Sequence, residues 1–201
     1  MNPTDWPSRL LVVDVEGNGT SQPDLVEVAA LPLRTGTPDV STALAWLIRP
    51  PRPVTQHATR VHGITNDQLA TCPAWDEVAD EVRHVLDGAW IAAHNAGTDY
   101  RALARHLPGW EPAGVVDTLR LARVTYTDAP RHGLDALIDH LDLDLSQAPA
   151  QRHRASFDAY AAAQVLLLAA SQYTTWHELI SAAVPPGMPG APADEAAPTL
   201  W

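Results

Sequence analysis

The order of the expected elements places this chain of 201 residues in the α/β class, as a mixed sheet flanked by helices. Three strand-like segments come first, and the short turns between them are typical of antiparallel neighbours. Helices and strands then alternate, and helices end the series, which indicates a mixed sheet rather than a purely antiparallel one. The length is typical of one domain with a sizeable core.

Five segments have the composition of strands. Arg9 to Glu16 is nearly continuously apolar up to its end. Asp24 to Arg34 and Ser41 to Pro50 follow, and each is bounded by Pro, Gly or Asp, which mark turns. Two shorter apolar runs, Ala89 to Asn95 and Ala113 to Thr118, come later and alternate with helices. These five runs are the expected sheet.

Helical periodicity covers most of the remaining chain. Apolar residues recur at helical spacing between Pro73 and Gly88, which mark the start and the end of that helix. Residues 50–70, just before it, are expected to form a loop with one short helical turn after Asn66 as N-cap. Further helices are expected at residues 97–109, 118–126, 133–143, 155–173 and 174–183.

The chain is therefore expected to form one domain over residues 1–184, followed by a tail over residues 185–201. The tail is rich in Pro, Gly and Ala and has no core of its own. It ends in two large apolar residues, Leu200 and Trp201. Three interpretations stay open: a dispensable tail, a Trp201 that folds back onto the domain, or an anchor for a protein partner.

Composition and charge narrow the class of protein. Apolar residues make up 46% of the chain, no run is long enough to span a membrane, and the first ten residues lack the pattern of a secretory signal. The single cysteine, Cys72, fits a reducing compartment, so a cytoplasmic location is expected. The net charge is −11, with thirteen Arg and no Lys, which excludes the broad basic surface of proteins that coat long duplexes. Any contact with nucleic acid is expected to be short, or to run through bound cations.

Acidic residues recur where the expected strands and helices begin or end. Asp14 and Glu16 are two residues apart in the first strand, so they point to the same face. Asp99 lies near the start of a helix, where backbone dipoles tolerate an anion. Asp158 lies inside a later helix, and His153 precedes it by five residues, about 140° around a helix. His153 is therefore expected on the loop before that helix.

Carboxylates this close repel one another, so something positive is expected between them. Oxygen ligands without thiolates select hard divalent ions such as Mg²⁺ or Mn²⁺. Two such ions stabilise the attacking and leaving oxygens of an in-line phosphoryl displacement. Each residue alone has an ordinary structural explanation, as a helix cap or a solvated side chain, and it is their order and spacing together that indicate a metal centre.

Six short motifs surround these residues in order along the chain. They are D-x-E at Asp14 and Glu16, VHGIT at residues 61–65, AHNAGTD at 93–99, VDTLRLAR at 116–123, HGLDALIDHL at 132–141, and H-x(4)-D at His153 and Asp158. Together they resemble the DEDDh branch of the DnaQ-like 3′–5′ exonucleases, over about residues 10–168, most of the chain. The sister DEDDy branch has a Tyr four residues before the last Asp, where this chain has Arg154.

The resemblance implies a ribonuclease H-like fold with a mixed five-stranded sheet, and a two-metal centre. It makes metal ligands of the four carboxylates and makes His153 the general base that deprotonates the attacking water, a task that suits an imidazole. It also implies contacts to the terminal nucleotide from the loop after the first strand and from two later motifs. The implied ligands are Asp14, Glu16, Asp99 and Asp158, and the implied substrate-binding residues are Val15, Gly17, Asn18, His62, Ile64 and Asn95.

Two departures from the family pattern bear on substrate preference. The family usually has Thr-Thr-Gly or Thr-Ser-Gly after the first Glu, where this chain has Gly17, Asn18 and Gly19. The glycines make this loop more permissive, and Asn18 offers a different set of hydrogen bonds. The position before Asp99 is usually Phe and is Thr98 here.

Three functions follow as hypotheses. The first is a metal-dependent 3′–5′ exonuclease that releases nucleoside 5′-monophosphates from single-stranded 3′ ends or short oligonucleotides. The second is a hydrolase of dinucleotides or of a nucleotide-like metabolite with the same metal centre, which the acidic surface and the altered loop favour. The third is a non-catalytic interaction module, and the complete set of four carboxylates and His153 argues against it.

Overall fold

Six strands form one mixed sheet in the computed structural model, which describes residues 5–34, 36–149 and 151–192. The order is β3-β2-β1-β5-β6, and β4 also pairs with β2. The strand β2 is antiparallel to β1, β3 and β4, whereas β5 lies parallel to both β1 and β6. Their bounds are β1 Leu10–Gly17, β2 Leu25–Arg34, β3 Thr37–Pro38, β4 Leu44–Leu47, β5 Trp90–Ala93 and β6 Gly114–Asp117. The five expected strands are present, and the two-residue β3 adds a sixth.

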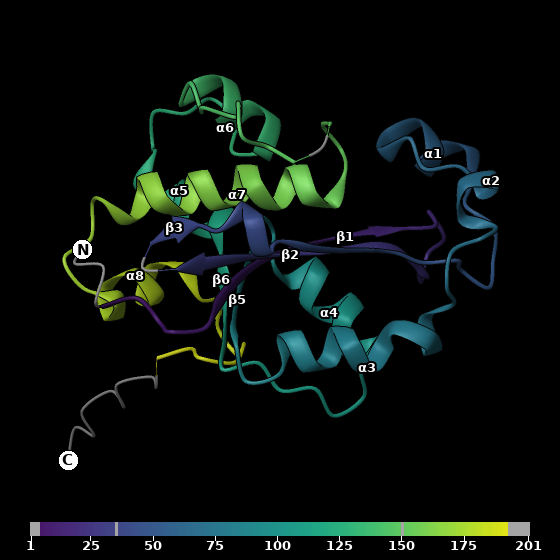
Figure 1. Ribbon diagram of the computed structural model, residues 1–201. Helices are drawn as coiled ribbons and strands as arrows, with labels where there is room; N and C mark the ends of the chain where they lie inside the picture. Colours follow the sequence, from purple (N-terminus) through teal and green to yellow (C-terminus); the bar gives the residue numbers. More distant parts are fainter. Residues whose placement is uncertain (1–4, 35, 150, 193–201) are drawn as a thin grey trace, which may run out of the picture.

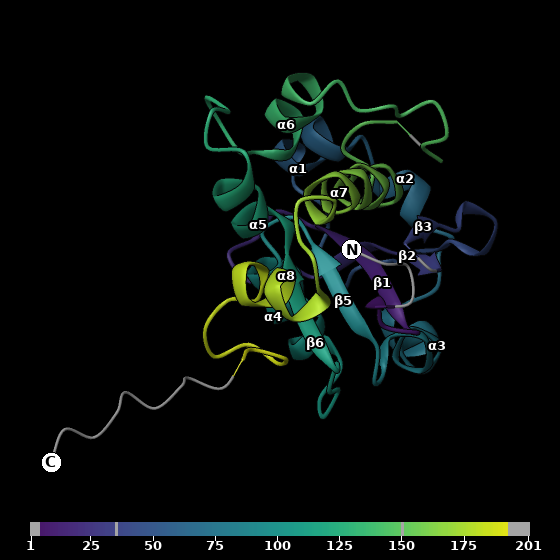
Figure 2. The same ribbon diagram turned by 90° about the vertical axis from the view of Figure 1, so that its left-hand side faces the viewer.

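Helices cover both faces of the sheet. Figure 1 shows α6 and α7 on one side of it and α3 and α4 on the other. Figure 2 shows α5 and α8 beside β6 at one edge. The helices are α1 Gln56–His62, α2 Asn66–Leu69, α3 Trp75–Leu86, α4 Gly97–His106, α5 Thr118–Thr125, α6 Leu134–His140, α7 Ala155–Ala170 and α8 Trp176–Ala183, with a 3₁₀ turn, η2, at Val40–Thr42.

The segment before α3 is more helical than the sequence indicates. Residues 56–62 were expected to be loop and instead form α1, because the Thr55 side chain accepts a hydrogen bond from Ala58 N and caps the helix. Gly63, with φ of 76°, ends it in the left-handed conformation that favours glycine. The N-cap of α2 is Thr65 rather than Asn66, since the Thr65 hydroxyl and the Gln68 side chain form a capping box.

Side chains at alternate positions of β1 pack into two separate hydrophobic cores. Leu10 and Val12 face the core under α7, and Leu11 and Val13 face the core under α3 and α4. The alternation continues to the end of the strand, so Asp14 and Glu16 lie on the α7 face. The helix α7 is apolar on nearly all sides and is therefore buried, and it carries Asp158 toward this face in its first turn.

The first residues of the expected tail pack on the domain. The Met188 side chain contacts both cores, and the Pro189 carbonyl accepts a hydrogen bond of 2.9 Å from Val115 N in β6. An added Cβ at Gly190 would meet the Trp90 ring. This segment covers the outer edge of β6, whereas Leu200 and Trp201 lie outside the described residues. The division at residue 184 stays a prediction.

None of the helices in the described part of the chain is long and apolar enough to cross a membrane.

Candidate metal centre

Three carboxylates from two elements converge at the end of β1. Asp14 and Glu16 reach the α7 face from β1, and Asp158 reaches it from the first turn of α7. One oxygen from each lies within 4.8 Å of the others. An all-oxygen cluster of this size is the donor set of a hard divalent cation. The structure therefore brings together three of the four predicted ligands, and their role as metal ligands stays a prediction.

Asp99 joins the site from the other side of β1. It lies in the first turn of α4, is only 4% exposed, and accepts a hydrogen bond of 3.2 Å from Val15 N through Oδ1. Burial is the main cause that raises its pKa to about 7. Its charge also helps raise the pKa of both Asp14 and Glu16, so the four carboxylates act on one another.

The electrostatics of the cluster fit a bound cation. Burial raises the pKa of Asp14 well above its ordinary value, and repulsion from Asp99, Glu16 and Asp158 raises it further. Burial and the same kind of repulsion raise the pKa of Glu16 to about 8. Without a cation, Glu16 would hold a proton near neutral pH, and a divalent ion would replace that proton. The donor set and its charge thus fit the divalent ions of the family.

His153 lies on the turn before α7, as its spacing from Asp158 predicts. Its φ of 61° is a left-handed conformation that is uncommon outside glycine. Burial raises the pKa of Asp158, and the nearby His153 imidazole and a hydrogen bond from the His153 backbone oppose that rise. The candidate base is therefore directly beside one of the candidate ligands.

The turn that leads to Asp99 is held by a network on its outer side. Asn95 has a φ of 67°, and its backbone N–H donates to Asp117 Oδ1 at 3.1 Å. Asp117 also caps α5 by accepting from the backbone N–H groups at its start. The Asn95 side chain is exposed and donates to the Thr98 hydroxyl at 3.1 Å. Asn95 remains a predicted substrate contact. The Thr98 hydroxyl, in the first turn of α4, accepts this hydrogen bond from Asn95.

His94 links this turn to the loop before α6. Its Nε2–H donates to the His132 carbonyl at 2.9 Å, so Nδ1 accepts from the Thr118 hydroxyl at 2.9 Å. Burial lowers the pKa of His94, which favours the neutral ring that these bonds require. The motifs at residues 93–99, 116–123 and 132–141 are thus joined by hydrogen bonds.

The Asn18 side chain bonds within its own loop, and its predicted contact with the substrate stays a prediction. Its side chain is fully buried and donates to Asp24 Oδ2 at 2.9 Å and to the Arg52 carbonyl at 3.2 Å. Its oxygen accepts from Asp24 N and from the Thr20 N–H and hydroxyl. The amide has no donor left for a nucleotide, and Asn18 fixes the shape of the loop over residues 17–24.

Two more predicted substrate contacts point into the protein. The Ile64 side chain is 2% exposed and packs with Val26, Val54 and Leu69, and its predicted place near the terminal nucleotide stays a prediction. His62 is equally buried; its Nδ1 accepts from Ile64 N at 3.0 Å, and its Nε2 has no hydrogen-bond partner among the described residues. Motif spacing places these residues in the right loop but cannot tell which side chains turn inward.

Val15 and Gly17 stay predicted substrate contacts. The Val15 N–H is committed to Asp99, and its side chain packs on the core under α3 and α4. Gly17 is partly exposed at the end of β1, and an added Cβ there would lie 2.6 Å from Cβ of Pro23. The Thr that is usual in the family would not fit under Pro23, which gives this departure a local cause.

Sequence reasoning missed two buried acids beside the site. Glu27 is 2% exposed on β2 and forms an ion pair with Arg154, and Asp117 is 8% exposed and supports the turn that leads to Asp99. Each has a signal in the sequence. Glu27 is a charge within an otherwise apolar strand, and Asp117 stands directly before a helix, where an N-cap is expected.

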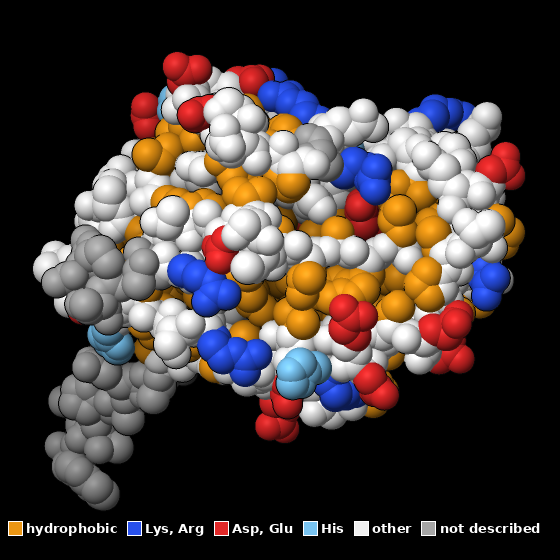
Figure 3. All heavy atoms as spheres, in the orientation of Figure 1, with side chains coloured by type: hydrophobic (Ala, Val, Ile, Leu, Met, Phe, Trp, Pro, Cys, Tyr) orange, Lys and Arg blue, Asp and Glu red, His pale blue; other side chains and the backbone are white. Residues whose placement is uncertain are grey.

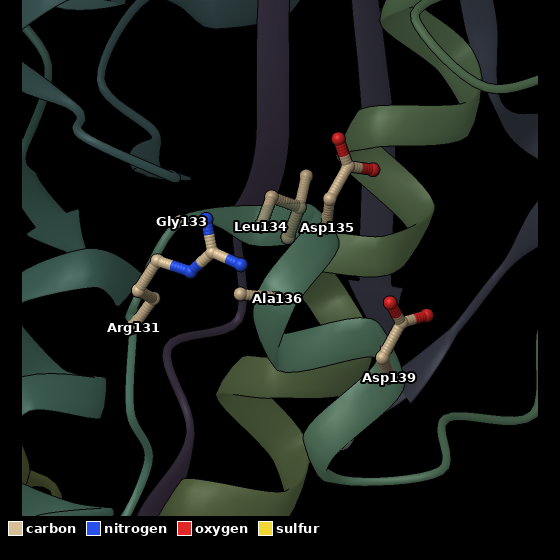
Figure 4. A pocket seen from close by; sticks show the side chains of 6 residues that line it. All are labelled: Arg131, Gly133, Leu134, Asp135, Ala136 and Asp139. Carbon is tan, nitrogen blue, oxygen red and sulfur yellow. The ribbon is translucent and has the colours of Figure 1, made fainter.

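A pocket of about 320 Å³ beside α6 contains none of the predicted site residues. Figure 4 shows Arg131 on one side of it, and Asp135 and Asp139 projecting from α6. Both acids form ion pairs with Arg152, at 3.5 and 3.4 Å. Through Arg152 this pocket borders the turn that carries His153, but its lining supplies no further group to the acidic cluster.

Among known protein families, a model described as exonuclease matches residues 11–166 of this chain. DNA polymerase III subunit epsilon from Pasteurella multocida is 32% identical over 181 residues, which cover 83% of this chain and 70% of that protein. The DNA polymerase III subunit epsilon-like protein from Rhodobacter capsulatus is 34% identical over 163 residues and 78% of this chain, but the match spans only 23% of that protein.

Solved structures of exonucleases are also similar to this chain. Exonuclease X in complex with 5′ overhanging duplex DNA matches with a TM-score of 0.69 and 28% identity, over 83% of this chain and 95% of that one. E. coli exonuclease I in complex with a dT13 oligonucleotide matches with a TM-score of 0.70 over 83% of this chain and 42% of that one. At 16% identity, the second match supports the fold alone.

Proposed function

The chain belongs to the exonuclease family, as a DnaQ-like 3′–5′ exonuclease with a ribonuclease H-like fold, and from this premise we propose its substrate and mechanism. The enzyme hydrolyses the terminal phosphodiester bond at a nucleic acid 3′ end and releases a nucleoside 5′-monophosphate. The observation that carries this proposal is the convergence of Asp14, Glu16 and Asp158 within 4.8 Å, with His153 on the adjoining turn.

The proposal assigns two divalent cations, Mg²⁺ or Mn²⁺, to the four carboxylates. The supporting observation is a donor set made of oxygen atoms alone, whose mutual repulsion a cation would relieve. When bound, such cations stabilise the attacking and leaving oxygens of an in-line phosphoryl displacement. Asp14, Glu16, Asp99 and Asp158 are proposed to hold them.

His153 is proposed to accept the proton of the attacking water. An imidazole can take up a proton near neutral pH and release it to solvent after the bond has broken. Its partial exposure leaves the ring a path to solvent. Removal of this group should therefore slow the chemical step without removing the cation ligands.

Single-stranded 3′ ends or short oligonucleotides are the proposed substrates. The net charge of −11 disfavours long tracts of polyanion, and acidic and basic side chains alternate on the face in Figure 3 without gathering into a basic band. Among the similar proteins, the exonuclease X structure holds a duplex with a 5′ overhang, and the epsilon proteins are named as polymerase subunits. A cytoplasmic location is proposed on the single Cys72. A protein partner for the tail over residues 185–201 stays a prediction, and the expected anchors, Leu200 and Trp201, lie outside the described residues.

Dinucleotides or a nucleotide-like metabolite are the alternative substrates. The loop at residues 17–24 favours them, because Asn18 and the Asp24–Arg52 ion pair hold it in one shape at the edge of the site. A fixed loop suits a small ligand with few contacts outside the metal centre. The acidic surface favours the same choice.

Product analysis on end-labelled DNA, RNA and dinucleotides tests these proposals. We expect stepwise shortening from the 3′ end, 5′-monophosphate products, and complete loss of activity in EDTA with recovery in Mn²⁺. His153→Ala should lower kcat by roughly 10²–10⁴-fold and keep Mn²⁺ binding in calorimetry. Internal cleavage, 3′-monophosphates or activity in EDTA would contradict the proposal. A higher kcat/KM on dinucleotides than on ten-residue oligomers would select the alternative substrate.

A further inference from the structure

Glu27 is a buried charge that the proposed reaction does not use. It stands opposite Glu16 in the antiparallel pair of β1 and β2, so its side chain lies on the α7 face of the sheet. Ala29 and Leu31, at alternate positions of the same strand, confirm this direction because they pack in the core under α7. Glu27 is therefore a fourth carboxylate on the α7 face, beside Asp14, Glu16 and Asp158.

Three hydrogen bonds hold the Glu27 carboxylate. Arg154 donates to it twice, from Nε at 3.0 Å and from Nη2 at 2.6 Å, in the two-pronged geometry that makes such pairs strong and directional. The third donor is Ala155 N at 3.0 Å. Ala155 is the first residue of α7, and the N-cap position, Arg154, has no side-chain acceptor of its own. Glu27 thus caps α7 from a neighbouring strand, where the helix dipole favours an anion.

The residues that Glu27 holds are joined directly to the reactive groups. The Arg154 carbonyl accepts from Asp158 N at 3.0 Å and so closes the helical turn that carries this ligand. His153, on the other side of Arg154, has an uncommon left-handed backbone. A shift of Arg154 would therefore move the candidate base and one candidate ligand together, relative to Asp14 on β1.

The turn is anchored on its outer side as well, but weakly. Arg152 forms ion pairs with Asp135 and Asp139 of α6 at 3.5 and 3.4 Å, and the side chains are 46, 56 and 76% exposed. Exposed pairs of this kind contribute little. In the Arg154–Glu27 pair the side chains are 25 and 3% exposed, so water screens it far less.

We propose that Glu27, acting through Arg154 and Ala155, is a positioning residue that fixes His153 and Asp158 against the carboxylates of β1. The inference rests on the proposed nuclease function for its catalytic consequence, but not for the positioning itself. Among the described residues, the Glu27 carboxylate accepts hydrogen bonds from Arg154 and Ala155, and the proposal gives it no contact with the substrate or a cation. Its loss should therefore lower kcat and leave KM unchanged.

Three variants of the full chain test this. Glu27→Gln keeps the size of the side chain and removes its charge, Arg154→Lys keeps the charge and removes the two-pronged contact, and Arg152→Lys makes the same exchange in the exposed pair as a matched control. On a ten-nucleotide DNA with Mn²⁺, we expect the first two to lower kcat by about 10–100-fold at unchanged KM. Arg152→Lys should keep the wild-type kcat.

A second readout needs no activity and no metal. In the metal-free protein, amide hydrogen exchange at residues 153–158 should accelerate in Glu27→Gln and in Arg154→Lys and stay unchanged in Arg152→Lys. The double variant Glu27→Gln/Arg154→Lys should lose no more kcat than the worse single variant, since the two residues act as one unit.

Distinct outcomes would overturn the proposal. Faster exchange with wild-type kcat in Glu27→Gln would make Glu27 a stabilising residue only. A raised KM in Arg154→Lys with normal kcat in Glu27→Gln would make Arg154 a substrate contact. Additive losses in the double variant would show that the two residues act independently. If the wild-type chain hydrolyses none of the substrates, the nuclease proposal fails, and unchanged exchange in both variants would then separately overturn the positioning role.

Discussion

Burial and neighbouring carboxylates raise the pKa of Asp14 far above its ordinary value, and the same causes act on Glu16. The alternation of side chains along β1 directs both groups to the α7 face, and the packing of α7 adds Asp158. At the scale of single residues, the site is therefore built from groups that oppose folding unless protons or cations neutralise them. This repulsion can be tested by removing one charge and by changing the pH.

Asp14→Asn should reduce hydrolysis to the background rate and raise the melting temperature of the metal-free protein. Asparagine keeps the shape of the side chain and removes one buried charge from the cluster, and the same is expected of Asp158→Asn. End-labelled oligonucleotide assays with Mn²⁺ and thermal melts in EDTA measure both effects. Asp128→Asn, at a carboxylate that is 81% exposed and outside the site, is the control and should change neither. Near-normal activity of Asp14→Asn in saturating Mn²⁺ would refute the metal assignment.

The stability of the metal-free protein should fall as the pH rises from about 5.5 to about 8.5. The pKa of Glu16 is raised from 4.5 to about 8 and that of Asp99 from 3.8 to about 7, so in this range the folded state binds more protons than the unfolded state. Each such proton lowers the free energy of unfolding by about 1.4 kcal/mol per pH unit. Melts in EDTA across this range, repeated with Mg²⁺, should show the decline and its reversal by the metal. A melting temperature in EDTA that does not change with pH would show that these groups are ionised throughout.

At the scale of elements, the loop between β1 and β2 is fixed from inside by Asn18 and from outside by α1. Thr55 N donates to the Asn18 carbonyl at 2.9 Å, and the ion pair of Asp24 with Arg52 closes the loop. Gly19, with φ of 80°, lies against the start of α1. This contact ties the loop at the edge of the site to a helix that the sequence did not indicate.

Gly19→Ala should destabilise the protein by more than Gly88→Ala and should raise KM. Both glycines have a left-handed backbone, which costs an alanine about 1–2 kcal/mol. At Gly19 the added Cβ would also overlap the Thr55 hydroxyl and lie 2.8 Å from Cβ of Ala58, whereas nothing lies within 4 Å at Gly88. Urea unfolding measures the difference in free energy, and oligonucleotide kinetics measure KM. Equal losses of stability would show that α1 moves aside freely.

At the scale of the whole molecule, the segment after α8 completes the edge of the sheet. Met188 lies close to Gly97, at the start of the helix that carries Asp99, and Pro189 bonds to β6. The sequence indicates a tail here, since Pro and Gly prevent regular structure. The packing shows that residues 188–191 contribute to both cores without forming a helix or strand.

Truncation after Val184 should lower the melting temperature by several degrees, whereas truncation after Pro192 should leave it unchanged. The first truncation removes the Met188 side chain and the hydrogen bond from Val115 N to the Pro189 carbonyl. Loss of the acceptor for Val115 N lowers the free energy of unfolding by on the order of 1–3 kcal/mol. Thermal melts of the two truncated chains measure this, with hydrolysis of a dinucleotide as the second readout. Equal melting temperatures would restore the simpler boundary at residue 184.

Patterns of neighbouring residues in the sequence were sufficient to predict most helices and strands. Alternation and periodicity depend on neighbours in the sequence, so the five expected strands, α3 and α7 could be predicted directly. The helix α1 could not, because three prolines come just before it and its position is stabilised by contact with Gly19. The two-residue β3 depends in the same way on pairing with β2.

The sequence by itself determined the candidate site of this protein: four carboxylates, one imidazole, their order, and the face of β1 on which two of them lie. Only the tertiary structure decided which side chains turn inward. Asn18 and Ile64 are buried, and Glu27 meets Arg154 across 127 positions of the chain. The reason is physical, since a periodic pattern fixes the direction of a side chain within its own element. Which partner it meets depends on how the elements pack, and that is a property of the whole chain.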